Sequence, residues 1–145
     1  MTARRASVVY RSRTGTTERY GRAIADYLRT LGLEADARSI AECDPASLPA
    51  TDLVLLGCWT NGWFVVHQHP DVPWVAFARD VPSLAGRRIG LFTTYRLVTG
   101  SMFARMREAL AHTGATVAVE FQSRDGRLSE RDRAALDRLV GDLAD

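Results

Sequence analysis

The sequence contains no lysine, and all 19 of its basic residues are arginine. A nucleoside-triphosphate loop of the GxxxxGK[ST] type needs its lysine on the terminal phosphates, so that kind of site is excluded. No apolar run approaches the roughly 20 residues that span a bilayer. The apolar segment behind the basic start is also shorter than the roughly 7–15 residues of a secretory signal. We therefore expect a cytoplasmic protein without a membrane partner.

The sequence also has few cysteines and a small net charge. The spacing of the two cysteines, Cys43 and Cys58, matches neither a disulfide framework nor a metal site, which favours reduced thiols. His67 and His69 form an H-x-H pair, but no third metal-binding residue lies at a sequence spacing typical of a metal site. We therefore expect no metal site. The net charge is only +2 and the arginines are scattered among Asp and Glu, which argues against a nucleic-acid partner.

The chain does contain a regular alternation of short apolar runs and longer amphipathic stretches. The apolar runs predict strands within 6–10, 33–40, 50–59, 87–95 and 115–121. Apolar residues at helical spacing predict helices over 16–31, 71–81 and 101–113, the last capped by Ser101, and a fourth helix that Ser129 begins. Strands that alternate with helices form a parallel sheet covered on both faces. The sequence therefore predicts a single α/β domain over residues 1–145.

Several hydroxyls surround a glycine at the first strand-to-helix turn, in the stretch RSRTGTTE (11–18). Ligands of open parallel sheets bind at the carboxyl ends of the strands, where we expect the loops 11–17, 58–70 and 93–100. A helix N-terminus stabilises a phosphate through its free N–H groups and its dipole. The alternative is an ordinary helix cap, which needs only one hydroxyl, fewer than this stretch contains. Arg13 either assists the phosphate or faces water. The predicted phosphate site consists of Ser12, Arg13, Thr14, Gly15, Thr16 and Thr17.

The same turn resembles the phosphate loop of the flavodoxin family. Its [ST]-x-T-G-x-T core is carried by Ser12, Thr14, Gly15 and Thr17, and LLGCWTNG (55–62) resembles the third strand and the loop behind it. The resemblance covers the order and spacing of all five strands, and the last strand lacks the insertion of long-chain members. It implies a flavodoxin-like three-layer sandwich with strand order 2-1-3-4-5, which binds FMN at the first loop.

Two tryptophans flank an Asn-Gly pair in the second loop. Aromatic side chains stack on flat conjugated rings, and Asn-Gly tolerates several turn types. The resemblance implies that the Asn61–Gly62 peptide turns over when the flavin is reduced. It also implies that Trp63, or else Trp59, stacks on the ring beside Thr60. The alternative is a tight turn whose tryptophans pack on the neighbouring helix.

The third loop departs from the pattern of the family. By direct counting, the position of the family's tyrosine falls on Thr99, whereas Tyr95 comes earlier and Arg96 replaces an acidic residue. Tyr95 covers the other flavin face if this loop folds differently from that of the family. The resemblance extends the expected FMN site to Thr93, Thr94, Tyr95, Arg96 and Thr99.

The resemblance implies an FMN-dependent electron-transfer protein that shuttles electrons between a reductase and an acceptor protein, without catalytic residues of its own. Electron carriers of this family are usually acidic, but the sequence pI is about 8.8, so the partners should have a different charge pattern. One alternative is an FMN-dependent reductase that acts directly on a small molecule such as a quinone, although no second nucleotide fingerprint is visible. Another is a binding module that has lost FMN, which the intact phosphate loop disfavours.

Overall fold

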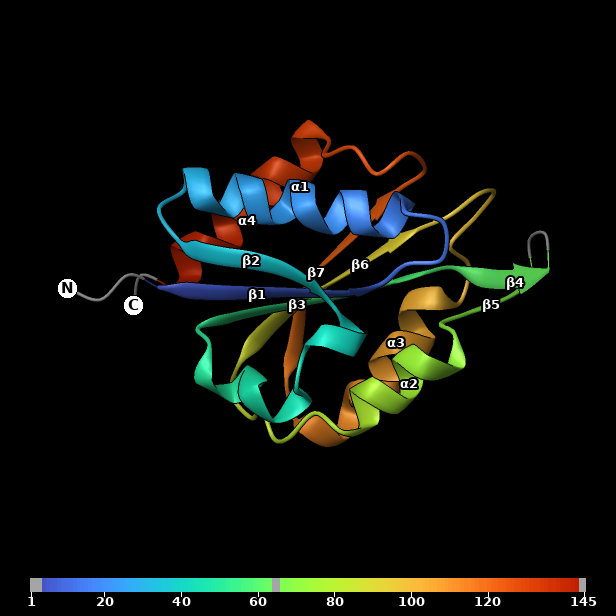
Figure 1. Ribbon diagram of the computed structural model, residues 1–145, viewed down its shortest axis with the longest axis horizontal. Helices are drawn as coiled ribbons and strands as arrows, with labels where there is room; N and C mark the ends of the chain where they lie inside the picture. Colours follow the sequence, from blue (N-terminus) through green and yellow to red (C-terminus); the bar gives the residue numbers. More distant parts are fainter. Residues whose placement is uncertain (1–3, 64–65, 144–145) are drawn as a thin grey trace.

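A five-stranded parallel sheet forms the centre of the computed structural model, which describes residues 4–63 and 66–143 (Figure 1). Its strands are β1 (Arg5–Arg11), β2 (Glu34–Ser39), β3 (Leu53–Trp59), β6 (Arg88–Thr94) and β7 (Thr116–Ser123). Neighbouring strands are parallel throughout, in the order β2-β1-β3-β6-β7. Counted among the strands of this sheet, the order is the expected 2-1-3-4-5, so that prediction is confirmed.

Helices cover both faces of the sheet. Figure 1 shows α1 (Thr16–Thr30) and α4 (Glu130–Leu143) on one face and α2 (Val72–Arg79) and α3 (Met102–Leu110) on the other. Three short 3-10 helices are η1 (Ile40–Glu42), η2 (Pro45–Ala50) and η3 (Ala111–Thr113). The described helices include none that combines the length and apolar character needed to cross a membrane. The predicted three-layer sandwich is confirmed.

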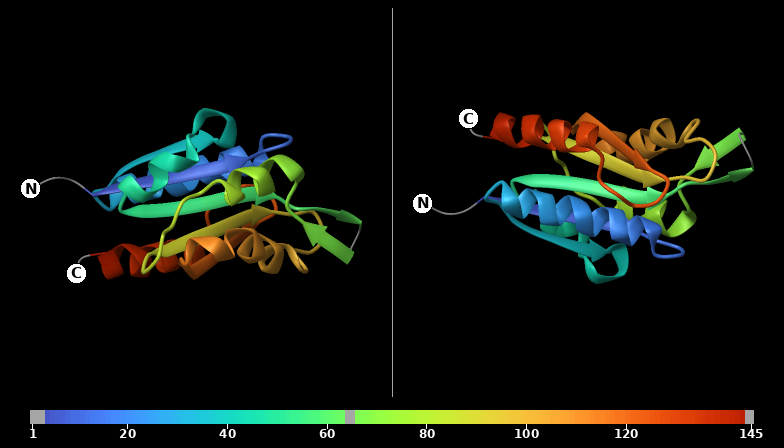
Figure 2. Two further views of the ribbon diagram at one scale, coloured as in Figure 1. Left: turned by 90° about the horizontal axis from the view of Figure 1, so that it is seen from below. Right: turned by 90° about the horizontal axis from the view of Figure 1, so that it is seen from above.

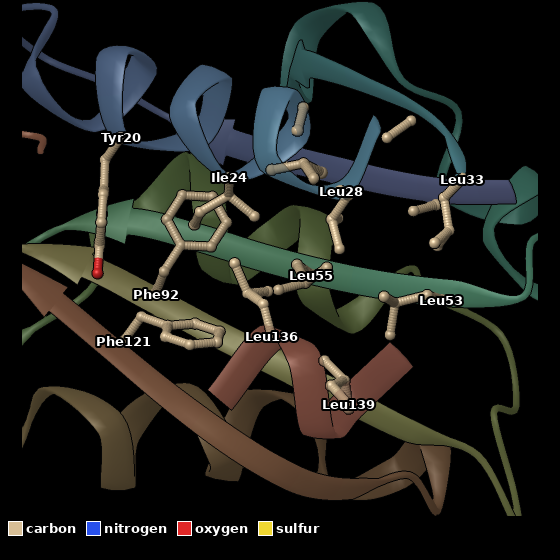
Figure 3. Packing of buried hydrophobic residues seen from close by; sticks show 14 of the residues in the cluster. Tyr20, Ile24, Leu28, Leu33, Leu53, Leu55, Phe92, Phe121, Leu136 and Leu139 are labelled. Carbon is tan, nitrogen blue, oxygen red and sulfur yellow. The ribbon is translucent and has the colours of Figure 1, made fainter. Parts of the chain in front are cut away.

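Each face of the sheet has its own hydrophobic core. Under α1 and α4, Tyr20 packs edge-on against Phe92, with ring centroids 5.9 Å apart and an interplanar angle of 85° (Figure 3). Other buried members of this cluster are Ile24, Leu28, Leu53, Leu55, Phe121, Leu136 and Leu139. Under α2 and α3, the buried cluster includes Val54, Leu56, Trp74, Leu91, Met102 and Met106. The central strands therefore contribute to both cores, as their continuous apolar runs predict.

A two-stranded antiparallel hairpin projects beyond the carboxyl end of the sheet (Figure 2). It consists of β4 (Asn61–Trp63) and β5 (Val66–His69). Asn61 pairs with His69 and Trp63 pairs with Val66, so β5 carries one extra residue and forms a bulge. His67 lies in this bulge with a φ of 58°. The sequence predicted only a loop over 58–70, which is therefore corrected to a hairpin along much of its length.

The two serines expected to begin helices behave differently. The Ser129 hydroxyl accepts the N–H of Asp132 over 3.0 Å, so the predicted start of α4 is confirmed. Ser101 makes no such cap bond to α3, and its hydroxyl instead donates to the Gln68 carbonyl over 2.7 Å. Ser101 therefore occupies the predicted N-cap position of α3, but a contact with β5 takes up the hydroxyl that would cap the helix.

Candidate functional site

The turn between β1 and α1 presents polar groups at the carboxyl end of the sheet. The Gly15 N–H donates to the Ser12 hydroxyl over 3.1 Å, and Gly15 begins α1 with a φ of 99°, a conformation that favours glycine. The N–H groups in the first turn of a helix have no acceptor within the helix. This turn therefore offers backbone donors and hydroxyls together, as its sequence predicts.

A cleft of about 400 Å³ opens beside this turn, where β1, β3, β6 and β7 end. The three loops that the sequence predicted to meet all contribute to it, and the loop after β7 adds one further residue. The lining consists of Arg13, Thr14, Thr16, Trp59, Thr60, Asn61, Gly62, Thr94, Tyr95, Arg96 and Arg124. The structure thus gathers most of the predicted site residues around one opening.

Threonines form the floor beneath the cleft. The hydroxyls of Thr17 and Thr94 share a hydrogen bond of 2.6 Å, and both residues are buried. Thr93 is also buried, donates to the Cys58 carbonyl over 2.7 Å and shares a second hydrogen bond of 2.7 Å with Thr60. Thr17 and Thr93 were expected in the cofactor site. Their hydroxyls connect α1, β3 and β6, and neither residue is among those that line the cleft.

Trp59, at the end of β3, forms one wall of the cleft. Its indole Nε1 donates to Asp71 Oδ2 over 2.9 Å, which fixes the direction of the ring. The guanidinium of Arg13 lies over the ring, 5.1 Å from its centroid. The sequence favoured Trp63 as the stacking residue, but its side chain lies outside what the structure describes. Among the described side chains, Trp59 is therefore the tryptophan available to a flat ligand.

Asp71 connects Trp59 to two other segments. Arg11 Nε donates to the same Oδ2 over 2.8 Å, and the Trp74 N–H donates to Oδ1 over 3.2 Å. Asp71 is only 7% exposed, and a carboxylate buried to that extent requires such partners. The hydrogen bond to Asp71 raises the pKa of Arg11 above its ordinary value, so the guanidinium stays charged. Sequence reasoning missed this role, although an Asp that precedes Val72-Pro73 is a recognisable helix start.

The thiol of Cys58 lies beside the same carboxylate, with its Sγ 3.7 Å from Asp71 Oδ1. Burial raises the pKa of Cys58 well above its ordinary value of 9.0, and burial also raises that of Cys43. Both cysteines are free. A neutral buried thiol is a poor nucleophile, so neither cysteine is suited to covalent catalysis. The described residues also assemble no cluster of metal-binding side chains.

Tyr95 provides a second aromatic surface. Its N–H donates to the Ser123 carbonyl over 3.2 Å, which continues the pairing of β6 with β7. The guanidinium of Arg124 lies 5.4 Å from the centroid of the Tyr95 ring. Thr99 donates to Gln122 Oε1 over 3.2 Å and is not part of the lining. Sequence reasoning missed Arg124, because only the topology brings the loop after β7 to the cleft.

Asn61 and Gly62 line the cleft from strand β4, not from the tip of a tight turn. A Cβ atom on Gly62 would lie 3.0 Å from Gln68 Cα and 3.1 Å from the His67 carbonyl oxygen. The backbone of β5 therefore packs too closely for a side chain at this position. The alternative of a tight turn at Asn-Gly is corrected, because both residues pair with or pack against β5.

Comparison with known proteins agrees with this arrangement. The sequence model of the flavodoxin family matches residues 8–136. The chain is 27% identical over 110 residues to a flavodoxin of Megasphaera elsdenii, an alignment that covers 76% of this chain and 79% of that protein. The matched region includes the β1–α1 turn and every residue that lines the cleft.

Solved structures of flavodoxins share the fold. The solution structure of two-electron reduced Megasphaera elsdenii flavodoxin is similar with a TM-score of 0.80 and 23% identity, covering 94% of this chain and 98% of that one. The flavodoxin of Streptococcus pneumonia TIGR4 is similar with a TM-score of 0.74 and 24% identity, covering 97% of each chain. Because the family model spans most of the sequence and the fold agrees, this chain belongs to the flavodoxin family.

Proposed function

We propose that this chain binds FMN in the cleft and carries electrons between partner proteins. The observation that carries the proposal is the meeting of a hydroxyl-rich helix N-terminus with two aromatic rings around one opening. FMN, when bound, supplies the redox chemistry by accepting and releasing one or two electrons. The protein supplies the binding groups, the orientation and the electrostatic environment.

The β1–α1 turn fits the phosphate end of FMN. Thr14 and Thr16 line the cleft, and the N–H groups of the first turn of α1 lie in the same segment. A dianion is stabilised there by the helix dipole and by hydrogen bonds, without a lysine. This donor set explains how a chain whose cations are all arginine can hold a phosphate.

The aromatic surfaces fit a flat ring. Trp59 and Tyr95 both line the cleft, and hydrogen bonds to Asp71 and Ser123 position them. A volume of about 400 Å³ lies within the roughly 300–1,000 Å³ typical of small-molecule sites. The described lining holds hydroxyls, aromatic rings and guanidiniums but no carboxylate or imidazole to act as a general acid or base, which supports a carrier.

Titration of the purified protein with FMN tests the phosphate site directly. In the double variant Thr14→Ala/Thr16→Ala, two hydrogen bonds to a charged phosphate are lost, each worth about 1.5–3 kcal/mol. We expect the dissociation constant for FMN to rise by at least about a hundredfold, because about 1.4 kcal/mol corresponds to a factor of ten. Thr30→Ala is the control, because Thr30 lies at the other end of α1, where its hydroxyl donates to the Tyr27 carbonyl. Equal FMN affinity in the double variant and the control would place the phosphate elsewhere.

Stepwise reduction of the FMN-loaded protein distinguishes the carrier from a direct reductase. A carrier should show resolved one-electron steps and react slowly with NAD(P)H alone. Rapid bleaching by NAD(P)H without an added reductase would contradict the carrier proposal and favour an enzyme that acts on a small molecule.

A further inference from the structure

Three arginines from three separate loops surround the mouth of the cleft. Arg13 follows β1, Arg96 follows β6 and Arg124 follows β7, and all three are exposed lining residues. Within the described part of the chain, none of them forms an ion pair with a carboxylate. The described lining also contains no Asp or Glu. The mouth therefore carries positive charge without local compensation.

Several surface arginines outside the cleft lie beside carboxylates. Arg22 lies 3.1 Å from Glu18, and Arg88 lies 2.6 Å from Asp142. The described cleft lining thus holds three cations and no carboxylate, although the net charge of the whole chain is only +2. This concentration matters because clustered charges at a cleft create a local potential that attracts molecules of the opposite sign.

The acidic residue nearest in sequence to this cluster is already engaged. Asp125 follows Arg124, and its carboxylate accepts hydrogen bonds from the Arg127 N–H over 3.0 Å and the Ser123 hydroxyl over 3.1 Å. These interactions, the Arg127 hydrogen bond first, hold the pKa of Asp125 below its ordinary value. Arg13 and Arg124, by contrast, lie over the rings of Trp59 and Tyr95, which keeps their charges at the mouth of the cleft.

An exposed apolar side chain accompanies these charges. Leu97 directly follows Arg96 and is 52% exposed. Contact with an exposed apolar side chain does not stabilise a small bound anion, whereas protein interfaces combine apolar contacts with a polar rim. The combination of Leu97 with the neighbouring arginines therefore favours a protein as the occupant of this edge.

We propose that the redox partner of this chain docks an acidic surface, rich in Asp and Glu, onto the edge formed by Arg13, Arg96, Leu97 and Arg124. The inference rests on the proposed function, since it assigns the partner to the FMN cleft. Docking there brings the partner's own redox centre to the mouth of the cleft. One electron then passes between FMN and that centre, which oxidises one protein and reduces the other without forming or breaking a bond.

Direct binding measurements with two redox proteins of opposite charge test the sign of this surface. The probes are an acidic ferredoxin and the basic cytochrome c, each titrated calorimetrically into the FMN-loaded chain. We expect binding of the ferredoxin that weakens when ionic strength rises from about 0.01 M to about 0.15 M, because the Debye length falls from about 30 Å to about 8 Å. We expect no such binding of cytochrome c.

Matched charge variants locate the surface. Arg96→Gln/Arg124→Gln, studied at saturating FMN, should lower the association rate constant for the acidic ferredoxin by about tenfold at low ionic strength. The control Arg4→Gln/Arg138→Gln removes the same charge from exposed positions before β1 and on α4, and should lower that rate less than about twofold.

The outcomes separate this inference from the proposed function. Failure of the protein to bind FMN would refute the function itself. An FMN-loaded protein that prefers cytochrome c would overturn the acidic partner, and so would equal rate losses in the two double variants.

Discussion

At the scale of the residue, Asp71 is the side chain on which the shape of the cleft depends. Asp71→Ala leaves Arg11 Nε and Trp59 Nε1 without their acceptor and removes the N-cap of α2. We expect the free energy of unfolding to fall by about 2–4 kcal/mol, measured by urea denaturation. A change in the near-ultraviolet circular dichroism should accompany it, because the indole of Trp59 loses its fixed orientation.

Asp44→Ala is the matched control for this prediction. Asp44 also caps a helix with a proline in its first turn, but Asp44 is exposed and its carboxylate accepts a hydrogen bond from the Ala46 N–H alone. We expect a loss of about 1 kcal/mol or less. If the two variants lost the same stability, Asp71 would be an ordinary helix cap and not the support of the tryptophan wall.

The buried thiol of Cys58 should make the free energy of unfolding depend on pH. Because burial raises the pKa of the thiol in the folded protein, the unfolded chain gives up this proton first as pH rises through the ordinary value of 9.0. Above that pH the unfolded state binds fewer protons, so the free energy of unfolding declines with a slope of up to about 1.4 kcal/mol per pH unit from this group.

Urea denaturation at a series of pH values between neutral and about 9.5 measures this slope, because most tyrosines, with an ordinary pKa of about 10, are still protonated there. Cys58→Ala should flatten the decline relative to the unchanged chain, whatever its effect on stability at neutral pH. An identical slope in both proteins would show that other groups cause the decline.

At the scale of the element, the hairpin of β4 and β5 links the cleft to the backbone behind it. Gly62→Ala places a Cβ about 3.0 Å from Gln68 Cα, so the two strands must separate. Because Gly62 lines the cleft, we expect weaker FMN binding together with a loss of stability of about 1–3 kcal/mol.

Gly86→Ala separates the strain of the backbone from the contact with β5. Gly86 has a φ of 78°, but a Cβ there would meet nothing within 4 Å. We expect this variant to lose about 1–2 kcal/mol of stability and to keep its FMN affinity. If FMN affinity fell equally in both variants, the close packing of the hairpin would have no part in the site.

The strands and helices of the sandwich could be predicted because the buried side of each element imposes a regular spacing of apolar residues. The β1–α1 turn could be predicted because its hydroxyls and Gly15 are contiguous in sequence. The hairpin could not, because the approach of β5 to Gly62 is a tertiary contact with no periodic signal. Ser101 lies at the predicted N-cap of α3, but the donation of its hydroxyl to the Gln68 carbonyl is likewise a tertiary contact that the sequence does not indicate. Arg124 lines the cleft, and Asp71 holds Trp59 there, only because the fold brings distant segments together.

At the scale of the whole molecule, a ligand in the cleft joins four strand ends and should stabilise the entire domain. FMN at about one hundred times its dissociation constant should raise the free energy of unfolding by about 2.7 kcal/mol. Thermal unfolding measures this as a rise in Tm.

Riboflavin at the same concentration is the control for the phosphate contribution, because it lacks the group that we assign to the β1–α1 turn. We expect a much smaller rise in Tm with riboflavin. Equal shifts for the two ligands would mean that the ring alone accounts for binding and that the turn serves another purpose.

The shared acceptor at Asp71 has a consequence for how this protein can vary. Arg11 and Trp59 lie on different strands, yet both donate to the same Oδ2. Their substitutions should therefore be non-additive, as is usual for residues within one hydrogen-bond network. Descendants of this sequence that replace one of the three residues should replace the others as well. Engineering a new aromatic wall at position 59 therefore also means rebuilding the junction between the first strand and the second helix.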